Sequence, residues 1–244
     1  MEKAVAVILI LSLCLMPVQI QAKSVTSGTD DNGNKWTYNT SAKTLTFTGN
    51  KAISDFTLNG HDREPSWYRW SDKTEHIVIE EGITGIGSEA FSSFTETKSI
   101  TMGESVKRIN RMAFWANVSL REIKLSSNIT VIQGDALSGG RELETIKLPM
   151  RLRKMCSLSG QEKLEKIVMP DSITNMQSAM FSECKKLKYI KLPAKIRKIK
   201  SYDFAGCKKL KKLTIPKSVK TVSMSAFAGS GLKKIVLPEN VTTI

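Results

Sequence analysis

The chain repeats a segment of about 23 residues, and this repeat restricts the possible folds more than any other feature of the sequence. Apolar residues that open a segment of the form I-x-[LIM] recur at spacings of 23, 23, 23, 21, 23, 23 and 22 residues. These openings are Ile77, Ile100, Ile123, Ile146, Ile167, Ile190, Leu213 and Ile235. Two further aliphatic columns follow six and nine positions into every unit. A fixed period of roughly 20 to 50 residues indicates a stack of repeated units.

The opening of each unit alternates apolar and polar residues, which is typical of a strand with one buried face. Proline follows in five units and ends the strand, because it lacks the N–H that a ladder to the next unit needs. One unit alone cannot offset an ordering entropy of about 1.5 kcal/mol per residue. Units stacked about 4.8 Å apart share their buried columns. Too few residues remain for a three-turn helix, so we expect a solenoid with a parallel sheet on one face and short turns on the other.

The repeat units ITGIGSEAFSSF, FSECKKLKYIKLP and FAGCKKLKKLTIPKSV resemble the BspA-like, or Treponema pallidum-type, leucine-rich repeats over about residues 77–244. The segments KWTYNTSAKTLTFTGN and PSWYRW are similar to the N-terminal segment that often precedes these repeats. The resemblance implies an α/β fold: a right-handed leucine-rich repeat solenoid with its parallel β-sheet on the concave face. We expect a signal peptide at 1–22, an N-terminal β-hairpin cap region at 23–75, and a solenoid of about eight coils, the last incomplete, at 76–244.

One position of the repeat, 17 residues into the unit, is where such repeats stack asparagine or cysteine to bond the backbone of the turns. It holds Phe94, Asn117, Gly140, Cys184, Cys207 and Ser230. Cys184 and Cys207 are then neighbours one coil apart, either as two buried thiols in this ladder or as a disulfide. We favour the thiols. The three cysteines after residue 22 cannot form a complete set of disulfides, so disulfides do not define this fold.

Two departures from the repeat carry expectations of their own. The unit from Ile146 to Lys166 is two residues short, and it has Met155 to Leu158 where the A-F turn should be, so we expect a bulge or a change of curvature there. The sequence ends at Ile244 within a unit and without a polar cap. An uncovered edge favours association, so one hypothesis is a structural or self-associating surface component that uses this C-terminal edge.

The N-terminus has the pattern of an export signal. Lys3 precedes an apolar run from Ala4 to Val18, and Ala22 ends a small-residue cleavage site, which predicts a signal peptide cut after Ala22. The run is shorter than the roughly 20 residues that a membrane-spanning helix needs. We therefore expect a secreted or cell-surface protein with no membrane span after signal removal.

The positive charge lies in the second half of the chain. Lys and Arg number 15 against 17 Asp and Glu through Thr145, a net −2, and 22 against 6 from Ile146 onward, a net +16. Residues beside each inward aliphatic should face outward on the sheet, where each of the last six units contributes a lysine. The candidate ligand-binding residues on this concave face are Lys124, Lys147, Lys166, Tyr189, Lys191, Lys212 and Lys234. Such a face attracts acidic macromolecules, although lysines also simply keep exposed strands soluble.

No pattern of catalytic or metal-binding residues accompanies these lysines. The histidines are only His61 and His76, so zinc-ligand spacing is lacking. The segment from Gly85 to Ala90 matches G-x-G-x-x-A, but it lies in the columns of the repeat rather than between a strand and a full helix. We expect no enzyme, no cofactor and no metal.

The expected partner is a host or matrix protein, or an acidic glycan, at the concave face. The family resemblance implies adhesion or protein binding. Nucleic acid is not expected as a physiological partner, because export argues against it and Tyr189 is the lone aromatic side chain for base stacking.

Overall fold

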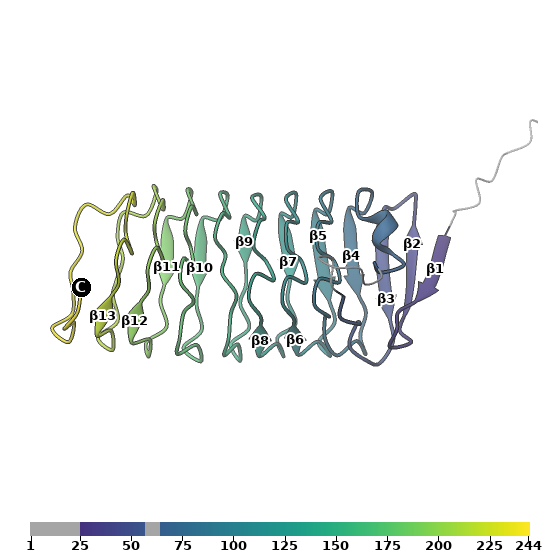
Figure 1. Ribbon diagram of the computed structural model, residues 1–244, viewed down its shortest axis with the longest axis horizontal. Coiled ribbons are helices and arrows are strands. Elements are labelled where there is room, and N and C mark those ends of the chain that lie inside the picture. Colours follow the sequence, from purple (N-terminus) through teal and green to yellow (C-terminus); the bar gives the residue numbers. More distant parts are fainter. Residues whose placement is uncertain (1–24, 57–63) are drawn as a thin grey trace, which may run out of the picture.

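The structure is a computed structural model that describes residues 25–56 and 64–244. Its strands lie side by side along one long axis, with β1 at one end and the last residues at the other (Figure 1). This arrangement confirms the expected solenoid with a parallel sheet. The expected signal peptide, with its cut after Ala22, lies outside the described residues.

The first three strands form an antiparallel sheet that continues into the solenoid. Strand β2 pairs with both β1 and β3, and β3 then pairs in parallel with β4. Their bounds are Val25–Thr29 (β1), Lys35–Asn39 (β2), Thr44–Thr48 (β3) and His76–Ile79 (β4). Trp67, beside the short 3-10 helix η1 (Tyr68–Trp70), packs edge-on against Phe47 with ring centroids 4.8 Å apart. Buried aromatic side chains thus join this N-terminal sheet to the first coil.

Each of the next five coils adds one parallel strand to the same sheet. The sheet has nine strands in the order β1-β2-β3-β4-β5-β7-β9-β10-β11. The added strands are β5 (Ser99–Met102), β7 (Glu122–Lys124), β9 (Thr145–Ile146), β10 (Lys166–Val168) and β11 (Tyr189–Lys191). Their leading isoleucines lie directly opposite one another in the ladder where the pairing covers them, as Ile100 does to Ile123. The repeat period therefore sets the register.

A second row of short strands runs parallel to the first, displaced across the width of the coils (Figure 1). It comprises the pairs β6 (Arg108–Ile109) with β8 (Val131–Ile132) and β12 (Lys198–Ile199) with β13 (Thr221–Val222). The second residue of each strand is buried and the first is exposed or half-buried. This row is formed by the aliphatic column nine positions into the unit.

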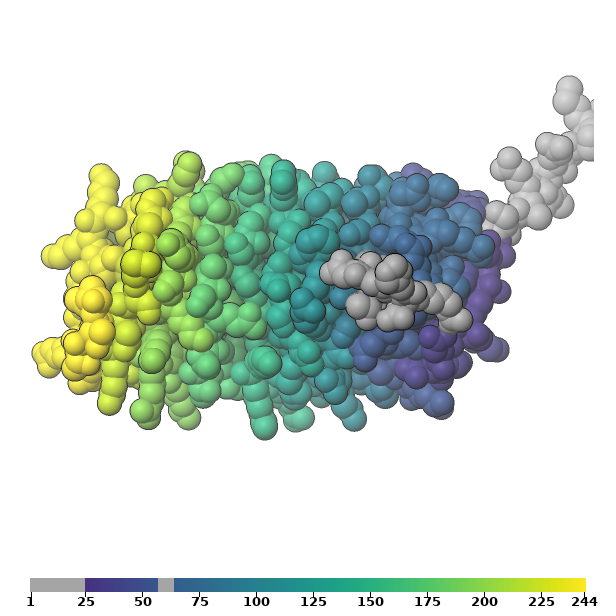
Figure 2. All heavy atoms as spheres, viewed as in Figure 1, coloured from purple at the N-terminus to yellow at the C-terminus, as the bar shows by residue number. Residues whose placement is uncertain are grey.

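The core is one continuous interior along the stack. The aliphatic column six positions into the unit is completely buried from Ile83 to Val219. Aromatic rings stack between coils, with centroids 5.4 Å apart for Phe91 and Phe114 and 5.9 Å apart for Phe181 and Phe204. Figure 2 shows the atoms of successive coils in contact with one another along the length of the molecule.

The coils close through tight turns. In a regular coil, two turn residues four positions apart have positive φ, as in Met112 (φ 54°) and Ala116 (φ 58°). Within the described residues the structure has no α-helix. The expectation of short turns in place of long helices is confirmed.

The cysteines form hydrogen bonds between coils instead of a disulfide. Cys184 Sγ donates to the Leu158 carbonyl at 3.2 Å, and Cys207 Sγ donates to the Phe181 carbonyl at 3.1 Å. Both thiols are free and buried. Gln161 occupies the same column in the short coil, where its Nε2 donates to the Leu137 carbonyl at 2.9 Å. Of the two alternatives for the cysteines, the structure has the thiol ladder.

The short coil differs from the others in its turn and in its strand pairing. Only one of its turn residues, Gly160, has positive φ (81°). On the sheet, β9 pairs with β10 through a single residue pair, Thr145 with Lys166, whereas β4 and β5 pair through four. The missing two residues therefore shorten the turn and interrupt the ladder of the main sheet.

Candidate ligand-binding face

The outward residues of the main sheet lie in two columns that the pairing defines. One column contains Ser99, Glu122, Thr145, Lys166 and Tyr189, each opposite the next. In the other column Thr101 lies opposite Lys124, and Val168 lies opposite Lys191. The predicted lysines are consequently divided between two columns and do not form one straight stripe. We call this outward surface of β7 to β11, with the coil after it, the sheet face.

The prediction of strands around Lys212 and Lys234 is wrong. The structure has no strand at either position, although both lysines are exposed. Leu213 and Ile235, the leading residues of these units, are only partly buried. The last coil has a neighbour on one side only within the described residues, so its ladder is incomplete and the coil before it is less tightly held.

A hollow of about 410 Å³ opens on the sheet face between β9 and β10. We call it the central hollow. Its lining is mostly apolar, and Lys147 and Lys166 stand among the apolar side chains. The residues are Thr145, Ile146, Lys147, Leu148, Met150, Lys166, Ile167 and Val168. The hollow lies where the strand pairing is reduced to one residue pair, so the short coil accounts for its position.

Two further hollows flank the central one. A hollow of about 530 Å³ lies between Lys124 and Lys147 and also includes Met150. Another of about 410 Å³ lies between Tyr189 and Lys212. Five of the seven predicted residues therefore line hollows on the sheet face, while Lys191 and Lys234 line none of these three.

The charges of the sheet face are largely free of carboxylate partners. Lys166 Nζ lies 5.4 Å from the centroid of the Tyr189 ring, a cation–π contact. Lys191 Nζ is 4.0 Å from Asp171 Oδ2 at an exposed position, which contributes little. Within residues 25–56 and 64–244, no ion pair involves Lys124, Lys147, Lys166 or Lys212. These four cations remain available to a ligand.

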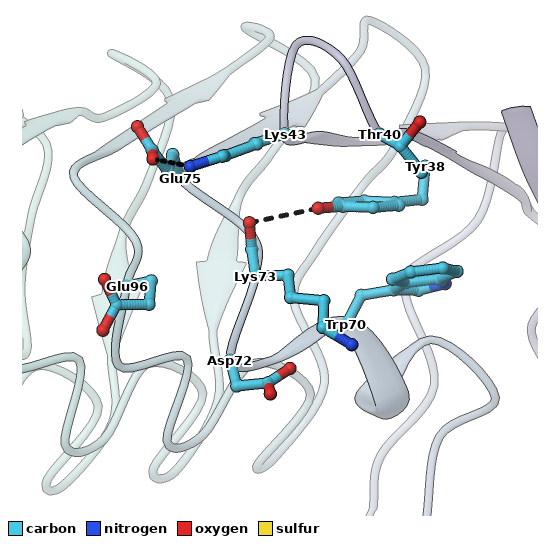
Figure 3. A pocket seen from close by; sticks show the side chains of 8 residues that line it. All are labelled: Tyr38, Thr40, Lys43, Trp70, Asp72, Lys73, Glu75 and Glu96. Atoms are coloured by element: carbon cyan, nitrogen blue, oxygen red, sulfur yellow. Dashed lines mark hydrogen bonds and ion pairs between the residues drawn. The ribbon is translucent and has the colours of Figure 1, made fainter. Parts of the chain in front are cut away.

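Another pocket, of about 290 Å³, lies near the N-terminal sheet, where Lys43 is already paired with Glu75 (Figure 3). Lys43 Nζ and Lys98 Nζ lie 2.6 Å and 2.5 Å from the carboxylate oxygens of Glu75. Hydrogen bonds from Lys43 and Lys98 lower the pKa of Glu75 to about 2. The Tyr38 hydroxyl donates to the Lys73 carbonyl at 3.0 Å. These contacts hold the N-terminal sheet to the first coil, so this pocket is a weaker candidate for ligand binding.

A metal-binding group and a membrane-spanning helix are both lacking in the part of the chain that the structure describes. No three His, Cys, Asp or Glu side chains there are grouped closely enough to hold a metal ion. No helix among those residues is long and apolar enough to span a bilayer. Gly85 and Gly87 pack closely against neighbouring coils, and a Cβ on Gly87 would overlap the Ser54 carbonyl. The dinucleotide-like segment is therefore structural.

The sequence did not reveal the central hollow. Met150 and Val168, which are 77% and 45% exposed, line it and were not among the predicted ligand-binding residues. The only sign of the hollow in the sequence was the 21-residue spacing of the short unit. This spacing indicated a local irregularity but not a cavity.

Comparison with known proteins found a family model that matches the repeats and solved structures with a similar fold. The model of the BspA type leucine rich repeat region matches residues 64–159 and 154–244. A leucine-rich repeat protein from Bacteroides ovatus is 24% identical, with a TM-score of 0.68 over 86% of this chain and 58% of that chain. The leucine-rich repeat protein of T. pallidum is 19% identical, with a TM-score of 0.57 over 82% of this chain and 83% of that one.

These two structures support the fold. The chain spans less than two thirds of the Bacteroides ovatus protein. A sequence comparison with curated proteins found no match.

Proposed function

We propose, from the premise that this chain belongs to the BspA-type leucine-rich repeat family, that it is a secreted or cell-surface binding protein with an adhesin-like role. Its sheet face would bind an acidic segment of a protein partner. The observation that carries this proposal is the central hollow, where exposed Lys147 and Lys166 stand beside an apolar surface.

The chemistry of the hollow favours a polypeptide over other acidic ligands. An acidic segment with one apolar side chain supplies carboxylates for the lysines and an apolar group for the surface of Leu148 and Val168. Burying one such side chain contributes about 1.5–3 kcal/mol, and the lysines add attraction at long range. An acidic glycan can pair with the lysines but has fewer apolar groups to bury against the lining of the hollow. It is therefore the alternative ligand that the experiment must exclude.

Export supports a partner outside the cell. The basic start, apolar run and Ala22 of the N-terminal segment are the sequence evidence for it. Because a partner in the surroundings or on a host surface meets an exported protein first, matrix and surface proteins are the class to test.

The test is an array of matrix proteins and acidic glycans probed at two ionic strengths. The strongest protein ligand is then measured against the variant Lys147→Glu/Lys166→Glu. Lys35→Glu/Lys51→Glu, at exposed positions near the N-terminal sheet, changes the net charge equally and serves as the control. We expect the first variant to lose at least about tenfold in affinity, the loss of about 1.4 kcal/mol, and the control to bind like the wild type. Equal binding by all three proteins, or a glycan as the tightest ligand, would contradict the proposal.

Self-association through the last coil stays a prediction. Val236 and Ile244 in this coil are 71% and 86% exposed. Sedimentation at several protein concentrations tests it, since a monomer at every concentration excludes this role.

A further inference from the structure

The second row of strands carries a basic surface that is separate from the sheet face. Two adjoining coils, at 194–202 and 216–222, carry six cations in or within four residues of β12 and β13. They are Lys195, Arg197, Lys198, Lys200, Lys217 and Lys220. Five of them are exposed and Lys200 is half-buried. We call this group the lateral basic cluster.

Backbone hydrogen bonds hold the two coils of the lateral basic cluster in register. The Lys220 amide donates to the Arg197 carbonyl at 2.8 Å, and Lys198 lies opposite Thr221 in the β12–β13 ladder. The Ser218 hydroxyl also spans the two coils, because it bonds to the Ala194 carbonyl at 2.7 Å. The cations consequently project from a fixed backbone at the coil spacing of about 4.8 Å.

Carboxylates near the cluster are few, and two of the three already have hydrogen-bond partners. Asp203 is completely buried, and it accepts hydrogen bonds from the backbone of its own coil and of the preceding one. Asp171, one coil earlier, accepts from the Ala194 amide and lies near Lys191. Glu239 lies one coil later. Within the residues that the structure describes, none of the six cations forms an ion pair.

We infer that the lateral basic cluster is a binding site for a linear, highly sulfated polysaccharide. Six like charges on two coils repel one another, and a polyanion that neutralises them releases its own counterions. A ligand with several charges per repeating unit matches this density better than one with a single carboxylate.

The surroundings of the cluster favour a polysaccharide over a nucleic acid. Tyr202, 45% exposed, is the large exposed aromatic residue in these two coils, whereas proteins that bind single strands stack successive bases on several aromatic side chains. Arg197 is the lone guanidinium of the six cations, so bidentate contacts to phosphate or to base edges are limited.

The inference is independent of the proposed function, because its residues lie in or close to the second row of strands and none of them belongs to the sheet face. A protein segment on the sheet face and a polysaccharide on the lateral basic cluster would occupy different rows. The protein could then be retained on a sulfated matrix while the sheet face stays open.

The test uses heparin as the probe and two matched triple variants of the full chain. Arg197→Gln/Lys198→Gln/Lys220→Gln removes three charges from the cluster, and Lys124→Gln/Lys147→Gln/Lys166→Gln removes three from the sheet face. The dissociation constant is measured at several salt concentrations, with the circular dichroism melting temperature as a check of folding. We expect the cluster variant to bind at least about tenfold more weakly. The slope of log Kd against log salt should fall by about 2, at roughly 0.7–0.9 for each lost contact, as for other polyanions.

The sheet-face variant should bind heparin within about threefold of the wild type, well below one tenfold step. Equal losses in both variants would mean that net charge alone attracts heparin and would overturn the inference. The wild type provides a second test that needs no substitution: desulfated heparin should bind at least about tenfold more weakly than heparin. Equal binding of the two, or tighter binding of single-stranded DNA at the same charge concentration, would also overturn it. Loss of protein-ligand binding by the sheet-face variant tests the proposed function separately.

Discussion

Asp203 gives the solenoid a pH-dependent stability that can be worked out from its surroundings. It lies in the column that holds Ala90, Ala113 and Ala226 in other coils, and it is completely buried. Its carboxylate accepts hydrogen bonds from the Met180 amide at 3.2 Å and from the Lys200 amide at 2.7 Å. Burial nevertheless dominates and raises the pKa of Asp203 from 3.8 to about 6.

The direction of the effect follows from linkage. The folded state holds the Asp203 proton more tightly than the unfolded chain does, so the neutral form stabilises the fold below about pH 4. This stabilisation is lost as the pH rises through about 6, the pKa of the folded state. A difference of roughly two pKa units, at about 1.4 kcal/mol each, is worth about 3 kcal/mol.

The assay compares wild type with Asp203→Asn, which is neutral at every pH. Urea unfolding at pH 4, 5, 6 and 7 gives the free energy of unfolding of each protein. The wild type should lose up to about 3 kcal/mol relative to the variant between pH 4 and pH 7. Asp135→Asn, at an exposed turn position in the coil directly before the short coil, is the control for the substitution itself. A difference between wild type and Asp203→Asn that stays constant across this range, or one that favours the wild type at higher pH, would refute the reasoning.

Three further substitutions or reactions test the packing of the coils. Phe204→Ala removes a buried ring that stacks on the rings of both neighbouring coils. It should lower the free energy of unfolding, measured with urea, by about 3–5 kcal/mol. A loss under about 1 kcal/mol would be incompatible with this stack. The three buried cysteines should not react with a thiol reagent until the protein unfolds, because burial raises the pKa of Cys156 and Cys207 to about 12; rapid labelling of the native protein would contradict their burial. Gly140→Ala should cost about 1–3 kcal/mol, because the new Cβ would lie 2.8 Å from Gln161 Nε2 and displace its hydrogen bond; an unchanged melting temperature would show that this bond contributes nothing.

The repeat made the core and the register predictable from the sequence. One aliphatic residue is weak evidence of burial, but an aliphatic residue at the same position of every unit is strong evidence of it. Ile173 and Ile196, which belong to such a column, are completely buried. Strand pairing followed from β4 to β9 and from β10 to β11, where the constant period of 23 residues places one leading isoleucine against the next. It did not follow at the short coil or in the last two coils, where this pairing is reduced or missing.

The features of the candidate site were harder to predict, because they depend on how the chain reconnects around the missing two residues. The central hollow and the exposure of Met150 arise where the ladder between β9 and β10 is interrupted. The division of the lysines into two columns was readable, since Lys166 precedes its isoleucine while Lys147 follows its own. The contact of Lys191 with Asp171 depends on the path of the next turn and was not readable.

The binding role of the sheet face is tested most directly by lysine footprinting of the wild-type protein. Reactivity towards an amine-modifying reagent is mapped by mass spectrometry, with and without the protein ligand recovered from the matrix-protein array. Lys147 and Lys166 are exposed beside the central hollow, and the ligand should protect both of them while Lys35 and Lys51 stay reactive. Unchanged reactivity of Lys147 and Lys166, with protection of lysines elsewhere, would contradict the assignment of the sheet face as the ligand-binding surface.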